Sequence, residues 1–435
     1  MTGHNAASGW SRRRFLGTSA AVTAAMMLPA ERLWASGSDT LRIGLIGCGG
    51  RGTGAARDCL RGSDGVELVA LGDVFSDRIE RCRASLAELA AEDTALGARI
   101  NVANDRTFTG FDAYQGVLGA GIDMVLIATP PAFRPLHVAA AVNAGKHIFM
   151  EKPVAVDPTG VRSIIASSDR ANARGLAIVA GTQRRHDSGY LEIMRRVHEG
   201  AIGEIVGAQV YWNQGGLWMH ERQAEWSDVE WQLRNWLYFT WLSGDHIVEQ
   251  HIHNLDVANW ALQAHPVRAV GVGGRQWRTD PAYGHIFDHF AIDYEYPDGV
   301  HVMSMCRQID GTASNVSEHL VGTSGTANPA RWIASGSSWR YEAEGSPVSP
   351  YQQEHTDLVA SIRAGAPLNE GRQVAESTLT AIMGREAAYT GAAITWDELL
   401  DANQSLVPEQ VQFGAMAVAP VAIPGVTKLE RTVGE

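Results

Sequence analysis

A stretch of thirteen residues, Gly244 to Asp256, concentrates the ionisable side chains that could move a proton. If it forms one helix, its three- and four-residue spacings separate an apolar face from a polar one that carries His246, Glu249, His253 and Asp256. An imidazole with a carboxylate one turn away is suited to acid–base chemistry near neutral pH. We therefore predict that His253 and Glu249 are catalytic.

Two other interpretations of this face remain open. His246, Glu249 and His253 could converge on one divalent metal ion, although the pattern matches no strong metal-binding signature. Alternatively, the four groups form a satisfied polar network at a domain boundary. His251 points away from the other side chains and is expected to be structural.

A glycine-rich loop follows the apolar run Leu41 to Ile46 and indicates a nucleotide site. It contains Gly47, Gly49, Gly50, Arg51 and Gly52, and Asp73 ends a second apolar run about twenty residues later. Glycines let the backbone approach a pyrophosphate at a helix N-terminus, and the acid binds ribose hydroxyls. This order predicts a Rossmann fold that binds NAD, and NADP less well, because a 2′-phosphate would face the Asp73 carboxylate.

The elements that must position these residues suggest an α/β chain with two domains. Apolar strands alternate with helices through residues 39–155, which predicts a doubly wound parallel sheet. Residues 156–395 read as an α+β domain with a large, mostly antiparallel open sheet, beginning with a helix at Pro158 to Arg174 and a strand at Ala177 to Thr182. Residues 396–435 read as an irregular tail that wraps the body or meets a partner subunit.

Composition and charge narrow the class of partner. The chain has 435 residues and a formal net charge of −12, so it lacks the basic footprint of a nucleic-acid-binding protein. Its four cysteines show neither C-x-x-C pairs nor the density of a disulfide scaffold, and we expect them to be free and structural. A small-molecule partner is favoured.

The first 36 residues read as a targeting segment. The run Ser11 to Leu16, with Arg12 and Arg13, resembles a twin-arginine export signal and precedes an apolar segment too short for a permanent membrane span. This predicts a partner in the twin-arginine export machinery and a periplasmic or otherwise exported location. An exported enzyme meets little free NAD, so the cofactor would have to be tightly bound.

The order of motifs resembles the Gfo/Idh/MocA family over roughly residues 41–390. The resemblance rests on the glycine loop, Ala128-Thr129-Pro130, Glu151-Lys152-Pro153, and the H-x-x-D spacing of His253 and Asp256. It implies that Thr129 and Pro130 lie against the nicotinamide riboside, that Glu151 and Lys152 belong to the cofactor site, and that Lys152 reaches the reacting hydroxyl or carbonyl. It also implies a cis bond before Pro153.

The same resemblance leaves specific points open. Lys152 could instead make a surface ion pair with Glu151 or a neighbour. Glu249 stands where the family commonly has Asp, which puts a simple transfer of the sugar dehydrogenase mechanism in doubt. The expected substrate contacts are Arg184, His186, Trp236, Asp245 and His246. Trp236 is one of six tryptophans between residues 212 and 241, most of which would serve packing.

The function expected from these features is an NAD-dependent oxidoreductase that acts on a secondary hydroxyl of a sugar, polyol or glycoside. A second hypothesis is an NAD-dependent glycosidase, in which transient oxidation at C3 permits elimination and no net NADH accumulates. A non-catalytic sugar-binding protein is the third, and a proton-transfer pair such as Lys152 and His253 argues against it. We also expect a homo-oligomer.

Overall fold

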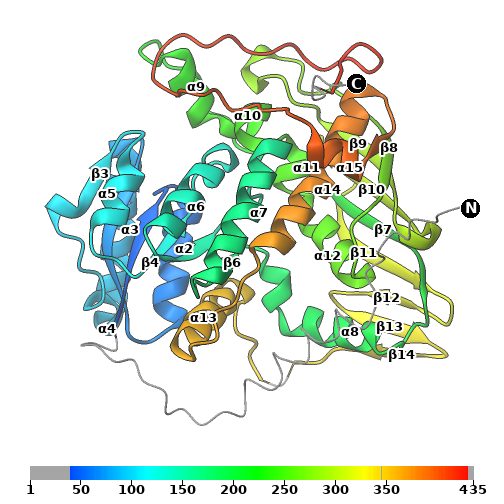
Figure 1. The fold of residues 1–435 in the computed structure, drawn as a ribbon, viewed down its shortest axis with the longest axis horizontal. Helices are drawn as coiled ribbons and strands as arrows, with labels where there is room; N and C mark the ends of the chain where they lie inside the picture. The colour runs from blue at the N-terminus through cyan, green and yellow to red at the C-terminus, as the bar shows by residue number, and fades with distance from the viewer. Residues whose placement is uncertain (1–39, 344, 430–435) are drawn as a thin grey trace, which may run out of the picture.

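The computed structural model describes residues 40–343 and 345–429, which form two sheets with helices around them (Figure 1). The twin-arginine segment predicted at residues 1–36 lies outside the described residues. The first sheet has six strands in the order β3-β2-β1-β4-β5-β6, all parallel. Its strands are β1 (Leu41–Ile46), β2 (Val66–Asp73), β3 (Thr107–Thr109), β4 (Met124–Ile127), β5 (His147–Met150) and β6 (Ile178–Ala180).

Helices cover both faces of this sheet, which is why its strands are almost continuously apolar. They are α2 (Gly50–Gly62), α3 (Ser76–Glu92), α4 (Thr94–Gly97), α5 (Ala113–Gly119), α6 (Arg134–Asn143) and α7 (Pro158–Ala173). Helix α7 shows why the chain turns where it does: the Asp157 side chain accepts the Gly160 N–H, and Pro158 occupies the first turn. The predicted doubly wound parallel sheet is confirmed.

One predicted boundary is wrong. The strand expected to open the second domain is β6, which pairs in parallel with β5 through Ile148 and Ile178. Helix α7 is therefore the crossover of a further strand–helix–strand unit, and the first domain extends to about residue 180 instead of 155. A three-residue apolar strand carries no periodicity that assigns it to one sheet or the other.

The second sheet has nine strands in the order β14-β13-β12-β11-β7-β10-β9-β8-β15, and only its β10–β7 pair is parallel. The strands are β7 (Ile205–Gln214), β8 (Arg268–Gly274), β9 (His289–Glu295), β10 (His301–Gln308), β11 (Asn315–Gly322), β12 (Thr326–Asn328), β13 (Trp332–Ser335), β14 (Ser337–Arg340) and β15 (Ile394–Thr395). The large, mostly antiparallel sheet is confirmed, whereas the strands β11 to β14 were not predicted.

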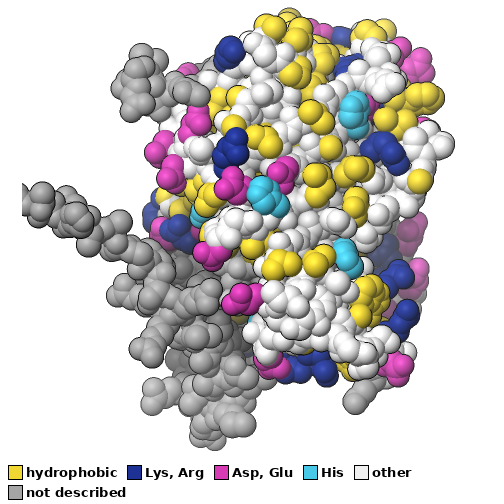
Figure 2. Space-filling view, turned by 90° about the vertical axis from the view of Figure 1, so that its right-hand side faces the viewer, with side chains coloured by type: hydrophobic (Ala, Val, Ile, Leu, Met, Phe, Trp, Pro, Cys, Tyr) yellow, Lys and Arg dark blue, Asp and Glu magenta, His cyan; other side chains and the backbone are white. Residues whose placement is uncertain are grey.

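The second sheet has one covered face and one open face. Helices α12 and α14 pack on the covered face, and β10 alternates accordingly: Val302 and Cys306 are buried, whereas Met303 and Met305 are exposed. Figure 2 shows the side of the molecule on which Figure 1 places β7 and β11 to β14, with hydrophobic side chains scattered among polar ones. The helices of this domain are α8 (Ser188–His198), α9 (Asp228–Arg234), α10 (Thr240–Ser243), α11 (His246–Glu249), α12 (Ile252–Leu262), α13 (Pro350–Arg363), α14 (Gly371–Thr390) and α15 (Trp396–Asp401).

Helix α13 completes the core of the first domain. It packs against α2, and Leu358, Val359 and Ile362 belong to the same apolar cluster as the outer layer of the first sheet. In Figure 1 it lies beneath the parallel sheet although it is distant from it in the sequence. The two domains therefore share a continuous interior.

Two further expectations need correction. The ionisable stretch is not one helix, because α11 ends at Glu249 and α12 begins at Ile252, so the predicted common polar face does not form. The tail does not begin at residue 396, since α15 occupies Trp396–Asp401 before the irregular segment. Among the described residues, no helix combines the length and apolar character needed to cross a membrane.

Candidate functional site

The glycine loop between β1 and α2 has the shape of a phosphate cradle. Gly47 has φ +97°, and a Cβ there would lie 2.7 Å from the Ala128 carbonyl carbon. A Cβ on Gly52 would lie 1.8 Å from the Gly47 carbonyl oxygen. By contrast, a Cβ on Gly49 or Gly50 would meet no atom within 4 Å. The loop is thus closely packed on its protein side and open at the N-terminus of α2, which fits a dinucleotide pyrophosphate.

Asp73, at the end of β2, is fixed to this loop. Its Oδ2 accepts the Cys48 N–H at 2.7 Å and its Oδ1 accepts the Phe75 N–H at 2.9 Å. Burial raises the pKa of Asp73, and the two backbone N–H groups oppose that rise. Each carboxylate oxygen keeps a lone pair, so Asp73 can still accept ribose hydroxyls. The residue fits its predicted role.

Arg51, paired with Glu151, connects the cradle to helix α13. Arg51 forms ion pairs with Glu151 and, at 3.3 Å, with Glu354 of α13, and its guanidinium lies 4.8 Å from the centre of the Tyr351 ring. Glu354 is fully buried, and burial raises its pKa well above the usual range. Tyr351 and Glu354 were not predicted as site residues, because no motif marks α13 as part of the site.

Thr129 and Pro130 follow β4 beside the cradle. The backbone N of Thr129 lies 2.8 Å from the position that a Gly47 Cβ would take. The Thr129 hydroxyl is 3.2 Å from Nδ1 of His137. Burial, followed by nearby Arg134, lowers the pKa of His137 to about 3, so that imidazole is neutral.

Lys152 stands at the carboxyl end of β5 and points toward the second domain. Its Nζ donates to the Glu249 carbonyl oxygen at 2.5 Å and to Glu249 Oε1 at 3.0 Å. The two side chains are 11% and 13% exposed, so this is a largely buried pair across the domain boundary and not a surface ion pair with Glu151. The Lys152–Pro153 peptide bond is cis, as expected.

His253 lies in the first turn of α12 with its ring stacked on Trp212, at 5.6 Å between ring centres and 22° between planes. Burial lowers the pKa of His253 well below its usual value, and the charges of Lys152 and Arg184 lower it further. The imidazole is therefore neutral at pH 7 and can accept a proton. Glu249, expected to orient this ring, bonds Lys152 instead.

Three of the predicted substrate residues have structural partners. Asp245 is fully buried, and its carboxylate accepts from the Tyr389 hydroxyl and from the N–H groups of His246 and Phe287. The buried His246 ring lies against Phe290, and burial lowers its pKa well below the usual range. His186 contacts Asp357 at 2.6 Å and Glu370 at 3.3 Å. Asp245 and His246 thus lie in the packing of the second domain, whereas His186 is held by α13 and by the residue that precedes α14.

The metal alternative also has no geometric support. Within residues 40–343 and 345–429, no group of three His, Cys, Asp or Glu side chains is placed to hold a metal ion. His246 is turned into the core and Glu249 toward Lys152. The four cysteines are free and buried, as predicted.

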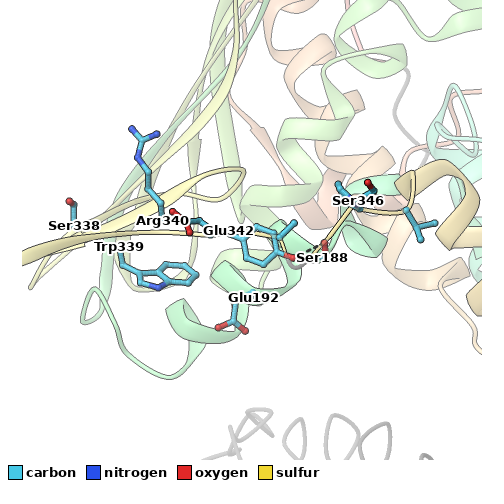
Figure 3. Close-up of a pocket in the computed structure, with 11 residues that line it drawn as sticks. Ser188, Glu192, Ser338, Trp339, Arg340, Glu342 and Ser346 are labelled. Carbon is cyan, nitrogen blue, oxygen red and sulfur yellow. Dashed lines mark hydrogen bonds between the residues drawn. The ribbon is translucent and has the colours of Figure 1, made fainter.

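Arg184 and Trp236 lie in different surroundings. Arg184 pairs with the buried Glu318, and its guanidinium lies 5.7 Å from the centre of the Trp212 ring, so Arg184, Trp212 and His253 form one wall. Trp236 is half-buried and packs near Trp218, with 6.4 Å between ring centres. The recess in Figure 3, lined by residues of α8, β14 and the segment after β14, shares no residue with this wall.

The cradle, Asp73 and the Lys152–Glu249 pair that joins the two domains beside His253 fit a two-domain oxidoreductase with an NAD-binding Rossmann domain. Family models agree: the model described as "Oxidoreductase family, NAD-binding Rossmann fold" matches residues 41–178, and the "GFO/IDH/MocA C-terminal domain" matches residues 190–328. The chain belongs to the Gfo/Idh/MocA family.

Curated relatives and solved structures are consistent with this assignment. The inositol 2-dehydrogenase of Acidiphilium cryptum is 29% identical over 60% of this chain and 66% of its own length. The 2,7-anhydro-N-acetylneuraminate hydratase of Escherichia coli is 27% identical over 47% of this chain and 50% of its own length. The scyllo-inositol dehydrogenase of Lactobacillus casei, solved with NAD(H) and scyllo-inositol, has a similar fold, with a TM-score of 0.62, 20% identity, and coverage of 82% of this chain and all of that one.

Proposed function

We propose that this protein oxidises a secondary hydroxyl of a sugar, polyol or glycoside with a tightly bound NAD. The observation that carries the proposal is the buried ion pair by which Lys152, from the first domain, meets Glu249 of the second domain, just before the helix that carries His253. Relatives named inositol 2-dehydrogenase support a polyhydroxylated ring as the substrate class.

The chain's own residues divide the work in this proposal. The neutral His253 accepts the proton of the reacting hydroxyl, while the Lys152 ammonium, held by Glu249, donates a hydrogen bond to the same oxygen as negative charge develops there. Bound NAD would supply the hydride acceptor. The face of Trp212 and the guanidinium of Arg184 would orient the substrate ring beside His253.

Tight binding of the cofactor follows from the proposed export. If the segment containing Arg12 and Arg13 directs the folded protein out of the cytoplasm, NAD must travel with it. We expect the wild-type protein in the periplasmic fraction and the Arg12→Lys/Arg13→Lys variant in the cytoplasm. Equal distribution of the two proteins would refute export by this route.

The direct test is to purify the folded protein, denature it, and measure the NAD that is released. The holoenzyme is then incubated with inositols, aldoses and glycosides while NADH absorbance and products are followed. We expect bound NAD and its reduction by at least one polyol or sugar. A protein that carries no NAD and has no affinity for added NAD would refute the proposal.

A second candidate function is glycoside cleavage with NAD as a resident cofactor. It is favoured by one observation: the relative from Escherichia coli bears the name of a hydratase, a class of enzyme without net oxidation. In this case sugar is released from a glycoside while NADH absorbance shows no net change. Accumulation of NADH in step with product would exclude it.

We also propose that the chain self-associates. Val272, Met303 and Met305 are exposed on the open face of the second sheet. The strand register places these three side chains close together on that face, and a contiguous exposed apolar patch can serve as a protein interface. Sedimentation velocity of the wild type and of a Met303→Glu/Met305→Glu variant tests this, and a monomeric wild type would refute it.

A further inference from the structure

A third hydrophobic cluster, separate from the cores of the two sheets, joins three parts of the chain. The first domain contributes Phe75, Phe111, Ala132 and Phe133, and the segment from Trp226 to Leu242 contributes most of the buried members. The irregular tail contributes Leu406, Val407, Val411 and Met416. Figure 1 shows this tail, in red, running along the top of the molecule past α9.

The position of this cluster relates it to the cofactor. Phe75 follows β2, Phe111 follows β3, and Phe133 follows β4. The carboxyl ends of parallel strands form the edge at which a doubly wound sheet binds its nucleotide. The cluster therefore lies over the edge that carries Asp73 and the glycine loop.

Specific bonds hold the tail in place. The Val229 N–H donates to the Gly414 carbonyl at 3.2 Å, and the Met416 N–H donates to Asp228 Oδ2 at 3.0 Å. The Gln232 side chain donates to the Met416 carbonyl at 3.0 Å. Helix α9 thus fixes the tail by three hydrogen bonds: one joins two backbone groups, and the other two join α9 side chains to backbone atoms of Met416.

Phe413 extends from this anchored segment to the first domain. Its ring centre lies 5.1 Å from that of Phe111 and 6.0 Å from that of Phe75. Arg234, at the end of α9, reaches the same loop: its Nη2 is 3.1 Å from Asp77 Oδ1, and its guanidinium is 4.0 Å from the centre of the Phe75 ring. The residues that Phe413 and Arg234 contact in this loop, Phe75 and Asp77, lie within four residues of Asp73.

We propose that residues 406–416, together with Arg234, form a strap that retains NAD by holding the loop from Asp73 to Asp77 against the adenosine ribose. This inference rests on the proposed function in so far as NAD is the cofactor. Phe413 and Arg234 are positioning residues, since they act through Phe75 and Asp77. Release of the dinucleotide would require the strap to detach from that loop.

The experiment measures how fast bound cofactor leaves. The protein is stripped of nucleotide, reloaded with NADH, and mixed with excess NAD while the fluorescence of bound NADH is followed. For Phe413→Ala, which loses its ring contacts with Phe75 and Phe111, we expect release about tenfold faster, the factor that corresponds to about 1.4 kcal/mol. Phe413→Tyr keeps the ring and should release NADH at close to the wild-type rate.

The matched control is Val426→Ala, because Val426 lies in the same tail and is 69% exposed. Thermal unfolding of the nucleotide-free proteins separates retention from stability: Phe413→Ala should melt close to the wild type while it releases NADH faster. Arg234→Lys serves as a second variant that keeps the charge beside Asp77 but loses the flat stacking on Phe75. The rate of NADH release from Arg234→Lys should lie between the rates of the wild type and of Phe413→Ala.

The outcomes distinguish the strap from the proposed function. Wild-type release rates in both Phe413→Ala and Arg234→Lys, with NADH still bound, would overturn the strap and leave the proposed function intact. Absence of NADH binding in the wild type would overturn both. Faster release only in variants whose nucleotide-free form also melts earlier would show a general structural effect and would overturn the strap as well.

Discussion

Replacement of Lys152 by alanine is the most direct perturbation of the proposed chemistry. The ammonium has two bonds to Glu249, at 2.5 Å to the carbonyl oxygen and at 3.0 Å to the carboxylate. Removing one positioned hydrogen-bond donor to a developing negative charge costs about 10²- to 10³-fold in kcat. We therefore expect kcat to fall by at least about 100-fold, which corresponds to about 2.7 kcal/mol in the activation free energy.

The same substitution should also cost stability, because it leaves the Glu249 carboxylate without its cation. At an effective dielectric constant of 20, unit charges 3.0 Å apart attract each other by about 5.5 kcal/mol before desolvation is subtracted. Removing one partner of a buried pair costs about 3 kcal/mol. The double variant Lys152→Ala/Glu249→Gln removes the unpaired charge, so it should recover most of that loss without recovering activity.

The assay combines stopped-flow NADH formation with urea unfolding for both variants. Lys146→Ala is the control, since Lys146 precedes β5, at the opposite end of the strand from Lys152, and its Nζ bonds the Ile122 carbonyl at 2.7 Å. It should keep wild-type kcat. A Lys152→Ala protein that binds NAD and retains more than a tenth of wild-type kcat would refute the role of Lys152.

Three further predictions concern pH and the glycine loop. Because the pKa of His253 is well below its usual value, the neutral base persists at low pH, and the pH–rate profile should show no acid limb near pH 6.5; such a limb, absent in His253→Asn, would contradict the assignment. Burial lowers the pKa of His186, but its bonds to Asp357 and Glu370 dominate and raise it to about 10. The protonated His186 therefore contributes its full stabilisation to the folded state below about pH 6.5, and this contribution is lost as pH rises toward 10. In urea unfolding, the difference in the free energy of unfolding between the wild type and His186→Gln should shrink over that range. Gly52→Ala should lower the melting temperature of the nucleotide-free protein, because a Cβ on residue 52 clashes with the Gly47 carbonyl oxygen. Gly49→Ala should leave the melting temperature unchanged and weaken NAD binding, because a Cβ on residue 49 enters the open space of the cradle. Thermal melting and isothermal titration with NAD check both variants.

The parts of the site that could be predicted are those determined by local backbone chemistry. The glycine loop, Asp73 and the residues that end β4 and β5 are where the motif spacing placed them, because each depends on a strand end and a turn. The interpretation of the stretch from Asp245 to Asp256 failed for the opposite reason. Helical spacing assumes an unbroken helix, and the break between Glu249 and Ile252 turns His246 toward Phe290 and Glu249 toward Lys152.

Tertiary partners explain the other differences. His186 had the right position in the sequence for a cleft residue, but Asp357 and Glu370 reach it from a part of the chain far downstream. The short strands β12 to β14 have three or four residues each, too few for a recognisable alternation. Glu354 and Tyr351 are found only once α13 is seen to pack on α2.

The contribution of α13 to the first domain has a consequence for how the chain folds during synthesis. Leu358, Val359 and Ile362 fill the layer beneath the parallel sheet, and Arg51 in the glycine loop finds Glu354 on the same helix. The nucleotide domain therefore cannot complete its core when the ribosome has made β6, and its cradle is not locked until α13 emerges. We therefore expect a fragment ending at residue 180 to expose the apolar side of α2 and to aggregate instead of folding independently.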